Sequence, residues 1–538
     1  MKLSDLLAVF PSKTISIEVP AVDRQSDSLK NEHRKNESRK NEPWITGIHC
    51  DSRTVEPGGL FVALTGFCTD GHEYITEAID RGAVAIAVDR TVNAPVTTIQ
   101  VANTRKALAV FASRFYGDPS CEMTVIGITG TNGKTTTSYL VENILKAAGL
   151  RVGVIGTINY RYGDKEVSAP VTTPEASDLQ KMLRQMRNDG VTHVVMEVSS
   201  HALALNRLDG CAFDVGVFTN LSQDHLDFHQ DMISYWNCKK RLFTDFLSTG
   251  PKKKQAVAVI NHDDSRGVQL ADELDLPVVA VGRGEQHQVF PVQVDIGQEG
   301  IAGTICLGKD TSNRGPVDTA IHSHLTGGYN LENILCAAGV GMALRLSPDT
   351  IRTGIDATRR VPGRLESVEN TAGIFVFVDY AHTPDALENA LENLKNTMSG
   401  RLICIAGCGG NRDRAKRPQM AAIAVRLSDL SIFTSDNPRE ESPMAIIEDM
   451  LTGINNGCRA YTATHLPGSL DPSGYVVEPD RRRAIQMGIG WAKAGDSVLI
   501  AGKGHETYQL IADRRIAFDD RLEAAQALKK KYPAPPNE

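Results

Sequence analysis

The feature that most constrains this chain is a glycine-rich loop between an apolar run and a helical pattern, at residues 125–137. The run predicts a buried strand, and Lys134 and Thr135 open the predicted helix. A strand, a loop and a helix in this order present backbone N–H groups to a phosphate chain. A strict Walker loop requires glycine at Ile128, so an ordinary glycine turn is the alternative. Because Gly-Lys-Thr directly follows a strand, we interpret the segment as an ATP site.

Length and composition exclude several classes of protein. A chain of 538 residues is too long for one core and suggests about three domains. The formal charge of −7 gives no support to nucleic-acid binding. No apolar stretch approaches the ~20 residues of a membrane span, and the N-terminus does not resemble a secretory signal. The ten cysteines are scattered without a Cys-x-x-Cys pair, which favours reduced thiols without a metal. We therefore expect a cytoplasmic protein without membrane insertion, and a monomer.

Strands that alternate with helical patterns predict an α/β fold of three domains. An N-terminal α/β domain is expected at residues 1–119, with a charged, disordered or extended insertion at 25–42. A central P-loop-type domain at 120–360 is expected to contain a mostly parallel sheet. A third, Rossmann-like α/β domain is expected at 361–538.

Polar residues close two predicted strands of the central domain, where ligands bind in parallel sheets. One strand ends at Glu197, a plausible Mg²⁺ ligand, and another leads to His225. A histidine is an uncommon ligand for Mg²⁺, so a hydrogen-bonded structural role is the alternative for His225.

A lysine interrupts an apolar stripe on the predicted helix at 233–247. At helical spacing, Lys239 shares a face with Tyr235, Cys238, Leu242, Phe243 and Phe246. A buried ammonium must be paired, lose its charge or be modified. A lysine that extends to solvent from the edge of the stripe is the alternative.

Together these segments resemble the Mur ligase family, whose members are ATP-dependent amide-bond ligases of peptidoglycan synthesis. Motifs in family order span nearly the whole chain, at residues 130–136, 197–201, 220–227, 235–243, 324–333, 362–366 and 379–387. The match at 235–243 places the family's carbamylated lysine at Lys239. A carbamate is carboxylate-like, which would explain a lysine at this position as a Mg²⁺ ligand.

The resemblance implies a set of ATP-binding, metal-binding and catalytic residues. Those matching nucleotide contacts are Gly130, Thr131, Asn132, Gly133, Lys134, Thr135, Thr136, Asn330, Asn333, Arg364, Asp379 and His382. Those implied to bind Mg²⁺ are Thr135, Glu197, His225 and Lys239 as N6-carboxylysine. Those implied to be catalytic are Lys134, Glu197, His225 and Lys239.

Further matches concern a nucleotide-sugar substrate, UDP-N-acetylmuramoyl-L-alanyl-D-glutamate. The implied contacts are Ser52, Arg53, Asp70, Gly71, His72, Thr172, Thr173, Ser199 and Arg207. Leu205 departs from the pattern, since some members have glutamine there, and this puts one substrate hydrogen bond in doubt.

The amino acid to be added is implied by Asp-Asn-Pro-Arg at 436–439, which marks family members that use meso-diaminopimelate. Members that use lysine lack this arginine, and a guanidinium fork suits the second carboxylate of diaminopimelate. The implied contacts are Arg412, Asp436, Asn437, Pro438, Arg439, Gly502 and Glu506. Glu506 could pair with the distal ammonium.

The family chemistry implies that the D-Glu γ-carboxylate attacks ATP to give an acyl phosphate and ADP. The diaminopimelate amine then displaces phosphate. One alternative is a ligase similar to folylpolyglutamate synthase, which lacks the Asp-Asn-Pro-Arg segment. The other is a non-catalytic relative that keeps the fold as an interaction scaffold. The retained Lys134, Glu197 and Lys239 disfavour the scaffold.

Overall fold

The computed structural model describes residues 1–8, 10, 15–18, 42–66, 69–297, 300–308, 315–455, 457–462 and 474–532. The predicted insertion at 25–42 lies outside these residues, apart from Glu42. The chain divides into two compact units. The first unit comprises Met1–Gly127, Arg151–Gly216 and Arg241–Ala256, and the second comprises Ile128–Leu150, Val217–Lys240 and Val257–Glu538. Among the described residues, no helix combines the length and apolar character needed to cross a bilayer.

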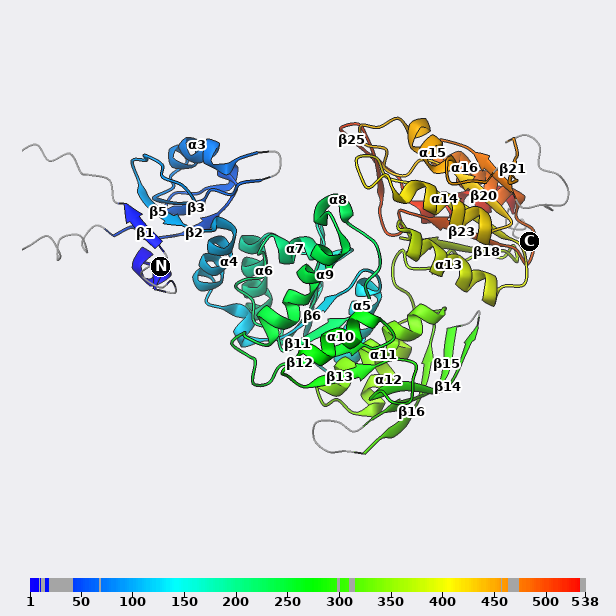
Figure 1. Cartoon of the computed structure of the whole chain (residues 1–538), viewed down its shortest axis with the longest axis horizontal. Coiled ribbons are helices and arrows are strands. Elements are labelled where there is room, and N and C mark those ends of the chain that lie inside the picture. Colours follow the sequence, from blue (N-terminus) through cyan, green and yellow to red (C-terminus); the bar gives the residue numbers. More distant parts are fainter. Residues whose placement is uncertain are drawn as a thin grey trace, which may run out of the picture. The chain divides into compact units, whose positions relative to one another are not determined.

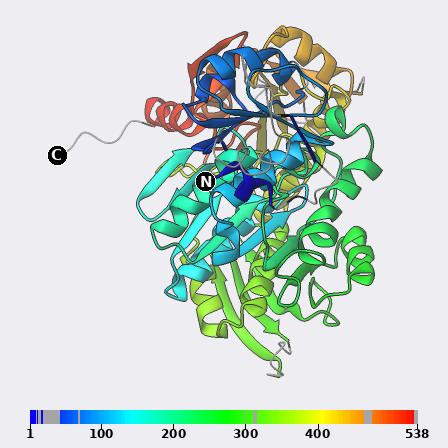
Figure 2. The same ribbon diagram turned by 90° about the vertical axis from the view of Figure 1, so that its left-hand side faces the viewer.

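The N-terminal part of the first unit is a five-stranded sheet with the order β1-β5-β4-β3-β2. Alternate residues of β3 enter two separate cores, because successive side chains of a strand point to opposite faces. Leu60 packs in the core that contains Phe111, whereas Phe61 packs in the core that contains Ile75. The helices that supply these residues are drawn in blue beside the sheet (Figure 2). The expected small α/β domain is therefore present.

The bounds of the elements in this part follow. The strands are β1 (Ile15–Glu18), β2 (Gly47–His49), β3 (Gly59–Val62), β4 (Ala85–Val88) and β5 (Thr97–Val101). The α-helices are α1 (Leu3–Leu7), α3 (Ile75–Asp80) and α4 (Thr104–Phe115). The 3₁₀ turns are η1 (Ser52–Thr54), η2 (Gly71–Tyr74) and η3 (Pro119–Glu122).

The largest sheet has eleven strands in the order β16-β15-β14-β13-β12-β11-β6-β10-β7-β8-β9. Strands β7 and β10 pair in parallel, as do β12 with β13 and β13 with β14. Antiparallel pairs extend both edges, through β15 and β16 on one side and β8 and β9 on the other. The sequence predicted a mostly parallel sheet, and the antiparallel strands at its two edges are the difference from that expectation.

The bounds of these elements are as follows. The strands are β6 (Thr124–Thr129), β7 (Val152–Ile155), β8 (Asn159–Tyr162), β9 (Lys165–Ser168), β10 (His193–Glu197), β11 (Val215–Phe218), β12 (Val257–Asn261), β13 (Val278–Val281), β14 (Val289–Gly297), β15 (Gly300–Leu307) and β16 (Val317–Ser323). The helices are α5 (Lys134–Ala147), α6 (Ala176–Asn188), α7 (Ser200–Ala204), α8 (Leu226–His229), α9 (Met232–Arg241), α10 (Ser265–Glu273), α11 (Gly328–Ala343) and α12 (Pro348–Ala357).

The predicted helix at 233–247 changes form partway along its length. It is α-helical to Arg241 and becomes a π-helix over Leu242–Leu247. All six residues of the predicted apolar stripe are buried, including Lys239, so the stripe is confirmed. Sequence periodicity could not separate the two helical forms. Short π-helical segments occur often at functional sites.

The C-terminal part of the second unit is a seven-stranded sheet with the order β17-β18-β23-β19-β20-β22-β21. Its strands pair in parallel except at β17. Cys404 of β19 packs in the core formed with α13, α14 and α15, whereas Ile403 and Ile405 pack in the core formed with α16 and α17. Helices therefore cover both faces of the sheet, as in a Rossmann-like layer (Figure 1).

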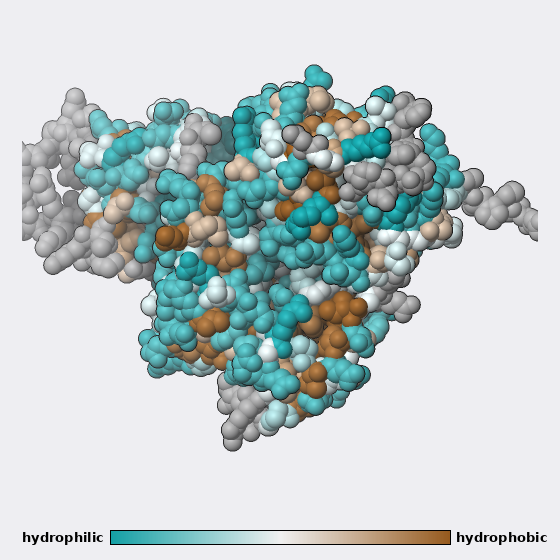
Figure 3. Space-filling model, turned by 45° about the vertical axis from the view of Figure 1, so that its right-hand side comes forward, coloured by the Kyte–Doolittle hydropathy of each residue, from teal (hydrophilic) through white to brown (hydrophobic). Residues whose placement is uncertain are grey.

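The bounds of the C-terminal elements complete the description. The strands are β17 (Glu366–Ser367), β18 (Phe375–Asp379), β19 (Leu402–Ala406), β20 (Leu430–Phe433), β21 (Arg459–Ala460), β22 (Gly474–Val477), β23 (Ser497–Ala501), β24 (Tyr508–Ile511) and β25 (Arg514–Ala517). The helices are α13 (Pro384–Thr397), α14 (Lys416–Leu427), α15 (Pro443–Leu451), α16 (Arg481–Trp491) and α17 (Asp520–Lys531). On the face drawn in Figure 3, hydrophilic residues predominate and hydrophobic ones form small scattered patches.

Candidate active site

A cavity of about 560 Å³ opens beside the glycine loop, within the second unit. Six of the residues predicted to contact the nucleotide line it: Asn132, Gly133, Thr136, Asn333, Arg364 and Asp379. A volume of this size suits a small-molecule ligand. The structure thus brings together residues that are up to about 250 positions apart in the chain.

The backbone of the glycine loop is fixed by close packing. Gly130 has a φ of 149°, and a Cβ atom there would lie 1.9 Å from the Thr219 hydroxyl. That hydroxyl donates to the carbonyl of Asn132 at 2.6 Å, and the Asn132 amide donates to the Asn220 side chain at 2.9 Å. Only glycine fits at position 130, and the N–H groups that follow lead into α5.

Two lysines meet at this loop. Lys134 Nζ donates to the carbonyl oxygens of Gly130 and Thr131, at 2.9 and 2.7 Å. Lys239 Nζ donates to the same Gly130 oxygen at 2.6 Å and lies 4.5 Å from the centre of the Tyr235 ring. Lys239 is only 1% exposed, and burial, with the nearby Lys134 charge, lowers its pKa well below the usual value. Lys239 therefore does not extend to solvent.

Residues after position 360 form the other side of the cavity. Arg364 Nη2 donates to the Thr135 hydroxyl at 3.1 Å. Asp385 accepts from the side chains of Asn132 and Ser222, at 2.6 and 3.0 Å. Burial raises the pKa of Asp379 to about 6, against the lowering effect of the Arg364 charge. The loop is thus hydrogen-bonded directly to the C-terminal part of the second unit.

The two predicted asparagines of α11 are buried and connected to each other. Asn333 Nδ2 donates to Asn330 Oδ1 at 3.0 Å, and Asn330 Nδ2 donates to the Thr326 carbonyl at 2.8 Å. Thr137 of α5 donates its hydroxyl proton to Asn333 Oδ1 at 3.3 Å. Asn333 lines the cavity, whereas Asn330 supports it from behind.

His225 begins α8 in a left-handed conformation, with a φ of 55°. Its Nε2 lies 3.4 Å from a carboxylate oxygen of Asp224, and its side chain is partly exposed. Burial raises the pKa of the Asp224 carboxyl, but its electrostatic interactions with His225 and His382 lower that pKa overall. Burial also lowers the pKa of His382, as does the charge of Lys416. His225 and His382 therefore belong to one electrostatic cluster around Asp224.

In the first unit, the residues predicted to contact the dipeptide form one polar cluster. Thr173 donates its hydroxyl to the Glu197 carbonyl at 2.7 Å and accepts from the Ser199 amide at 3.2 Å. Arg207 Nη1 donates to the Thr173 carbonyl at 2.9 Å. The hydroxyl of Thr172 lies 3.2 Å from that of Thr157. The structure thus brings Thr172, Thr173, Ser199 and Arg207 together with Glu197.

The predicted uridine-diphosphate contacts lie at two tight turns of the N-terminal sheet. Asp51 caps η1 and accepts three hydrogen bonds from the side chain of the exposed Arg53, at 2.9, 3.2 and 2.6 Å. Asp70 caps η2, where Gly71 begins, and bonds Nδ1 of His72 at 2.7 Å. A hydrogen bond from Arg90 lowers the pKa of Asp70. Ser52 instead donates to Glu77 at 2.9 Å.

Arg412 and Arg439 lie close together in the predicted amino-acid site. A Cβ atom on Gly409 would contact both, with Arg439 Nη1 at 3.0 Å and Arg412 Cγ at 3.7 Å. Burial lowers the pKa of Arg439, and the Arg412 charge lowers it further. Two guanidinium groups that repel each other favour an anion between them, and a carboxylate matches their fork geometry.

In contrast to the arginine pair, the region around Glu506 contains two carboxylates, those of Glu506 and Asp436. Glu506 Oε2 accepts from Lys503 Nζ at 2.7 Å and from Asn437 Nδ2 at 2.8 Å. Lys503 lies 3.7 Å from Asp436, and a Cβ atom on Gly502 would lie 3.2 Å from the same carboxylate. Burial raises the pKa of Glu506, as does the charge of Asp436. Glu506 therefore already has a cationic partner within the chain.

Sequence reasoning missed some residues of these sites. Asp385 lies inside the motif at 379–387, and Lys503 lies beside the predicted contact Gly502, so the sequence contained a signal for both. Arg283 lines the cavity and donates to the Gly328 carbonyl at 2.9 Å, but no motif marked it. Only the folded chain brings Arg283 to the start of α11.

The donor set can be tested for its fit to Mg²⁺. Thr135 and Glu197 offer buried oxygen atoms, the donors that Mg²⁺ prefers. The Glu197 carboxylate accepts from the amide and hydroxyl of Thr157, at 3.0 and 2.8 Å. Lys239 offers an amine, which is not a Mg²⁺ ligand unless it is converted to a carbamate with two oxygens. The oxygen donors fit Mg²⁺, and Lys239 fits after that conversion.

Comparison with known proteins identifies the family to which this fold belongs. Three family models match: the Mur ligase family catalytic domain at residues 44–116, the Mur ligase middle domain at 128–341 and the Mur ligase glutamate ligase domain at 363–504. The chain belongs to the Mur ligase family. The family prediction is thereby confirmed, together with the α/β fold class.

Individual proteins and solved structures give more specific matches than the family models. The chain is 50% identical over 490 residues to the UDP-N-acetylmuramoyl-L-alanyl-D-glutamate–2,6-diaminopimelate ligase of Geobacter metallireducens, covering 90% of this chain and 94% of the relative. A solved structure of an enzyme with the same name is 30% identical, with a TM-score of 0.63 over 91% of this chain and 96% of that one. A MurF ligase from Thermotoga maritima in complex with ADP has a TM-score of 0.58 at 19% identity, covering 90% and 97% of the two chains, which shows a shared fold.

Proposed function

We propose that the chain is an ATP-dependent ligase of peptidoglycan synthesis. It adds meso-2,6-diaminopimelate to the D-Glu γ-carboxylate of UDP-N-acetylmuramoyl-L-alanyl-D-glutamate, with release of ADP and phosphate. The observation that carries the proposal is the arginine pair around Gly409, in a chain that is 50% identical to a ligase of this name. Such a reaction supplies the cell wall on which cell shape and division depend.

The first step is phosphoryl transfer, in which the γ-carboxylate oxygen attacks the γ-phosphorus of ATP and ADP leaves. This chemistry depends mainly on positioning and charge neutralisation. The N–H groups of the glycine loop hold the phosphates, and Lys134 supplies a positive charge at the loop. Thr173, Ser199 and Arg207 hold the dipeptide end that carries the attacking carboxylate. The product is an acyl phosphate.

The second step joins the amino acid. The amine nitrogen attacks the acyl carbon, loses a proton, and the carbon–oxygen bond to phosphate breaks. Arg412 and Arg439 bind the carboxylate of diaminopimelate that lysine lacks. Glu506 already pairs with Lys503, which also lies near Asp436. The distal ammonium of diaminopimelate would therefore bind beside two carboxylates, those of Glu506 and Asp436, rather than beside one. The pair of arginines therefore sets the choice of amino acid.

We further propose two Mg²⁺ ions, of which one would be held by Thr135 and Glu197 and the other by His225 and carbamylated Lys239. When bound, they would neutralise charge on the phosphates and on the reacting carboxylate. Carbamylation joins the neutral Lys239 amine to CO₂ and releases one proton. Burial beside a second lysine favours the neutral amine that this reaction needs.

The test measures phosphate release with ATP, Mg²⁺ and the UDP-muramoyl dipeptide, comparing meso-diaminopimelate with L-lysine. We expect turnover with diaminopimelate and little with lysine. Arg439→Lys should raise the KM for diaminopimelate more than it lowers kcat, since it removes a two-pronged carboxylate contact. The control is Arg414→Lys, which alters a largely exposed arginine of a neighbouring loop. Turnover with lysine alone would refute the assignment of the amino acid.

Two other functions lead to different results in the same assay. A non-catalytic scaffold would bind nucleotide yet release no phosphate with either amino acid. A ligase similar to folylpolyglutamate synthase would require a folate substrate and would not use the UDP-muramoyl dipeptide.

The predictions of a monomer, of a cytoplasmic location and of domain boundaries at 119 and 360 stay predictions. Each family model lies within one of the three predicted domains, which supports those boundaries.

A further inference from the structure

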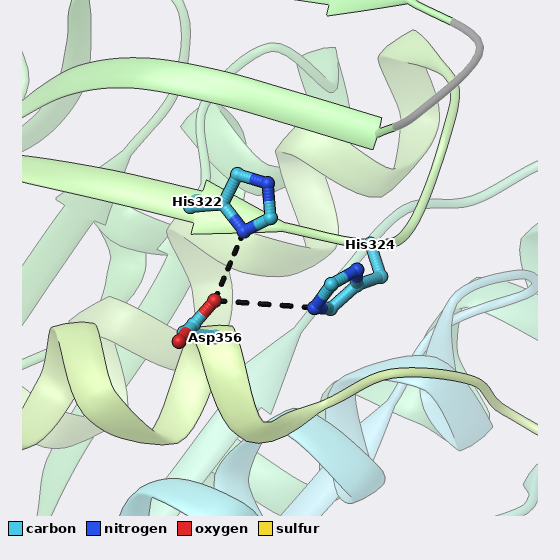
Figure 4. A group of neighbouring side chains, drawn as sticks. All are labelled: His322, His324 and Asp356. Carbon is cyan, nitrogen blue, oxygen red and sulfur yellow. Dashed lines mark hydrogen bonds and ion pairs between the residues drawn. The ribbon is translucent and has the colours of Figure 1, made fainter.

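Two histidines and an aspartate lie together outside the proposed active site (Figure 4). His322 belongs to β16, His324 follows that strand, and Asp356 belongs to the last turn of α12. All three are in the second unit, and none lines the nucleotide cavity. Among the described residues, they are the one group of three whose ligand atoms lie within 4.8 Å of one another.

The extended backbone at the end of β16 explains why both imidazoles lie on the same side of the chain. Residues two apart on an extended strand point the same way, so His322 and His324 face Asp356 together. His322 Nδ1 lies 2.9 Å from Asp356 Oδ1, and His324 Nε2 lies 4.0 Å from the same oxygen. The two rings meet edge to face, with centroids 4.9 Å apart and an interplanar angle of 88°.

We propose that His322, His324 and Asp356 form a binding site for a transition-metal ion, and the ligand chemistry favours Zn²⁺ as the occupant. Two imidazole nitrogens and one carboxylate oxygen are ligands that Zn²⁺ accepts, and three protein ligands leave a fourth position open to water. At metal–ligand distances of about 2.0–2.2 Å, ligand atoms in a tetrahedron lie about 3.3–3.6 Å apart. The present spacing requires a small inward rotation of His324, whose side chain is 35% exposed.

The surroundings agree with a bound cation rather than a contact that stabilises the fold. An exposed pair such as His322 with Asp356 contributes little to folding, and it gives no reason for a second imidazole at the same carboxylate. Hard ions such as Mg²⁺ prefer oxygen ligands, whereas two of the three donors here are imidazole nitrogens, which favours a transition-metal ion over Mg²⁺.

The site lies between β16 and α12, and each of these elements adjoins a helix that lines the nucleotide cavity. His324 lies close in sequence to Gly328 and Tyr329, which line the cavity at the start of α11. Helix α12 packs on α5, where Asn143 donates to the hydroxyl of Thr358 at 2.9 Å. A metal ion held by both elements would link the end of β16 to the end of α12.

The experiment measures Zn²⁺ binding to the full chain by equilibrium dialysis, after chelator treatment and with Mg²⁺ in excess. We expect His324→Asn and Asp356→Asn to weaken binding of one equivalent by about tenfold or more. The matched control is His287→Asn. It alters another pair of neighbouring rings, His262 and His287, with centroids 5.2 Å apart. Cys121→Ser tests whether an exposed thiol binds the ion instead.

A second measurement keeps the result independent of stability. Co²⁺ replaces Zn²⁺ at such sites and gives visible absorption bands that report low-symmetry, four-coordinate binding. The wild type and His287→Asn should show these bands, and the two site variants should lose them while they melt at the same temperature without metal. Equal Zn²⁺ binding by all variants, or loss of binding only in Cys121→Ser, would overturn the proposal.

Discussion

At the scale of single residues, the shared carbonyl of Gly130 brings two lysines unusually close. Both Lys134 and Lys239 donate to this one oxygen, at 2.9 and 2.6 Å. Two ammonium groups so placed would repel each other, and together with burial this favours the neutral form of the Lys239 amine. A carbamate on Lys239 would replace that neutral amine by an anion, which the Lys134 ammonium attracts. The position of Lys134 at the glycine loop therefore favours carbamylation of Lys239.

This argument predicts the behaviour of Lys239→Ala. The variant should lose the carbamate signal that ¹³C-labelled CO₂ gives in NMR spectra of the wild type. Its kcat should fall by about a hundredfold or more, because charge neutralisation worth several kcal/mol is lost. The control is Lys240→Ala, which alters the next residue in a partly exposed pair with Glu273. A full carbamate signal in Lys239→Ala would assign the modification to another lysine.

His505 gives a prediction about pH. Burial lowers its pKa to about 3, and the Arg364 charge contributes. The unfolded chain takes up this proton near pH 6.5, whereas the folded chain does so only near pH 3. The free energy of unfolding therefore falls as the pH falls between these values, by up to about 1.4 kcal/mol per pH unit. Denaturation of His505→Gln at pH 7.5 and 5.5 should show a smaller pH dependence than the wild type.

The control for this pH effect is an exposed side chain that binds no proton between these pH values. Gln419→Ala on α14 should keep the wild-type difference between the two pH values. Identical pH dependence in His505→Gln and the wild type would contradict the depressed pKa.

At the scale of elements, a buried ion pair holds the loops of the proposed amino-acid site. Arg481 of α16 binds Asp520 of α17 through two hydrogen bonds, at 2.8 and 2.6 Å, and both side chains are fully buried. Arg481 also donates to the carbonyls of Ala501 and Ser435, at 2.9 and 3.4 Å. These carbonyls directly precede Gly502 and Asp436, so the pair positions both segments.

Arg481→Ala should destabilise the second unit by about 3–5 kcal/mol, because it leaves Asp520 buried without its cation. The neighbouring Arg482→Ala is the matched control. Arg482 is 55% exposed in its pair with Glu523, so its loss should cost about 1 kcal/mol or less. Urea denaturation of both variants compares the two values. Similar losses would mean that burial does not separate the two pairs.

Elements with a strong periodic signal were predictable from the sequence. The apolar runs of the central and C-terminal sheets became strands, and the helical stripe around Lys239 is buried as expected. The π-helix at Leu242–Leu247 was not predictable, because both helical forms place the same residues on one face. The motifs predicted members of the site, but Arg283 lacked any local signal. Its position depends on β13 reaching α11, which is a property of the folded sheet.

At the scale of the whole molecule, the nucleotide cavity depends on two distant parts of the chain. Asp385, at the start of α13, accepts from Asn132 of the glycine loop and from Ser222. Arg364 donates to Thr135. The second unit therefore completes the cavity around the loop through side chains that follow residue 360.

Asp385→Ala should weaken binding of a non-hydrolysable ATP analogue by about tenfold, since it removes two hydrogen bonds to a charged group. Titration calorimetry on the full chain measures this affinity. Asp349→Ala is the control, because its side chain is 87% exposed on α12. Unchanged affinity in Asp385→Ala would show that the loop holds its conformation without this contact.

The bond between Asp385 and the glycine loop limits how such enzymes can be recombined. A chimera that takes residues 361–538 from a relative, to change the amino acid it accepts, would also replace one wall of its nucleotide cavity. The donor must therefore carry an acid at position 385 and an arginine at position 364. An exchange of residues 361–538 that changes the amino-acid specificity would therefore also change the ATP-binding cavity.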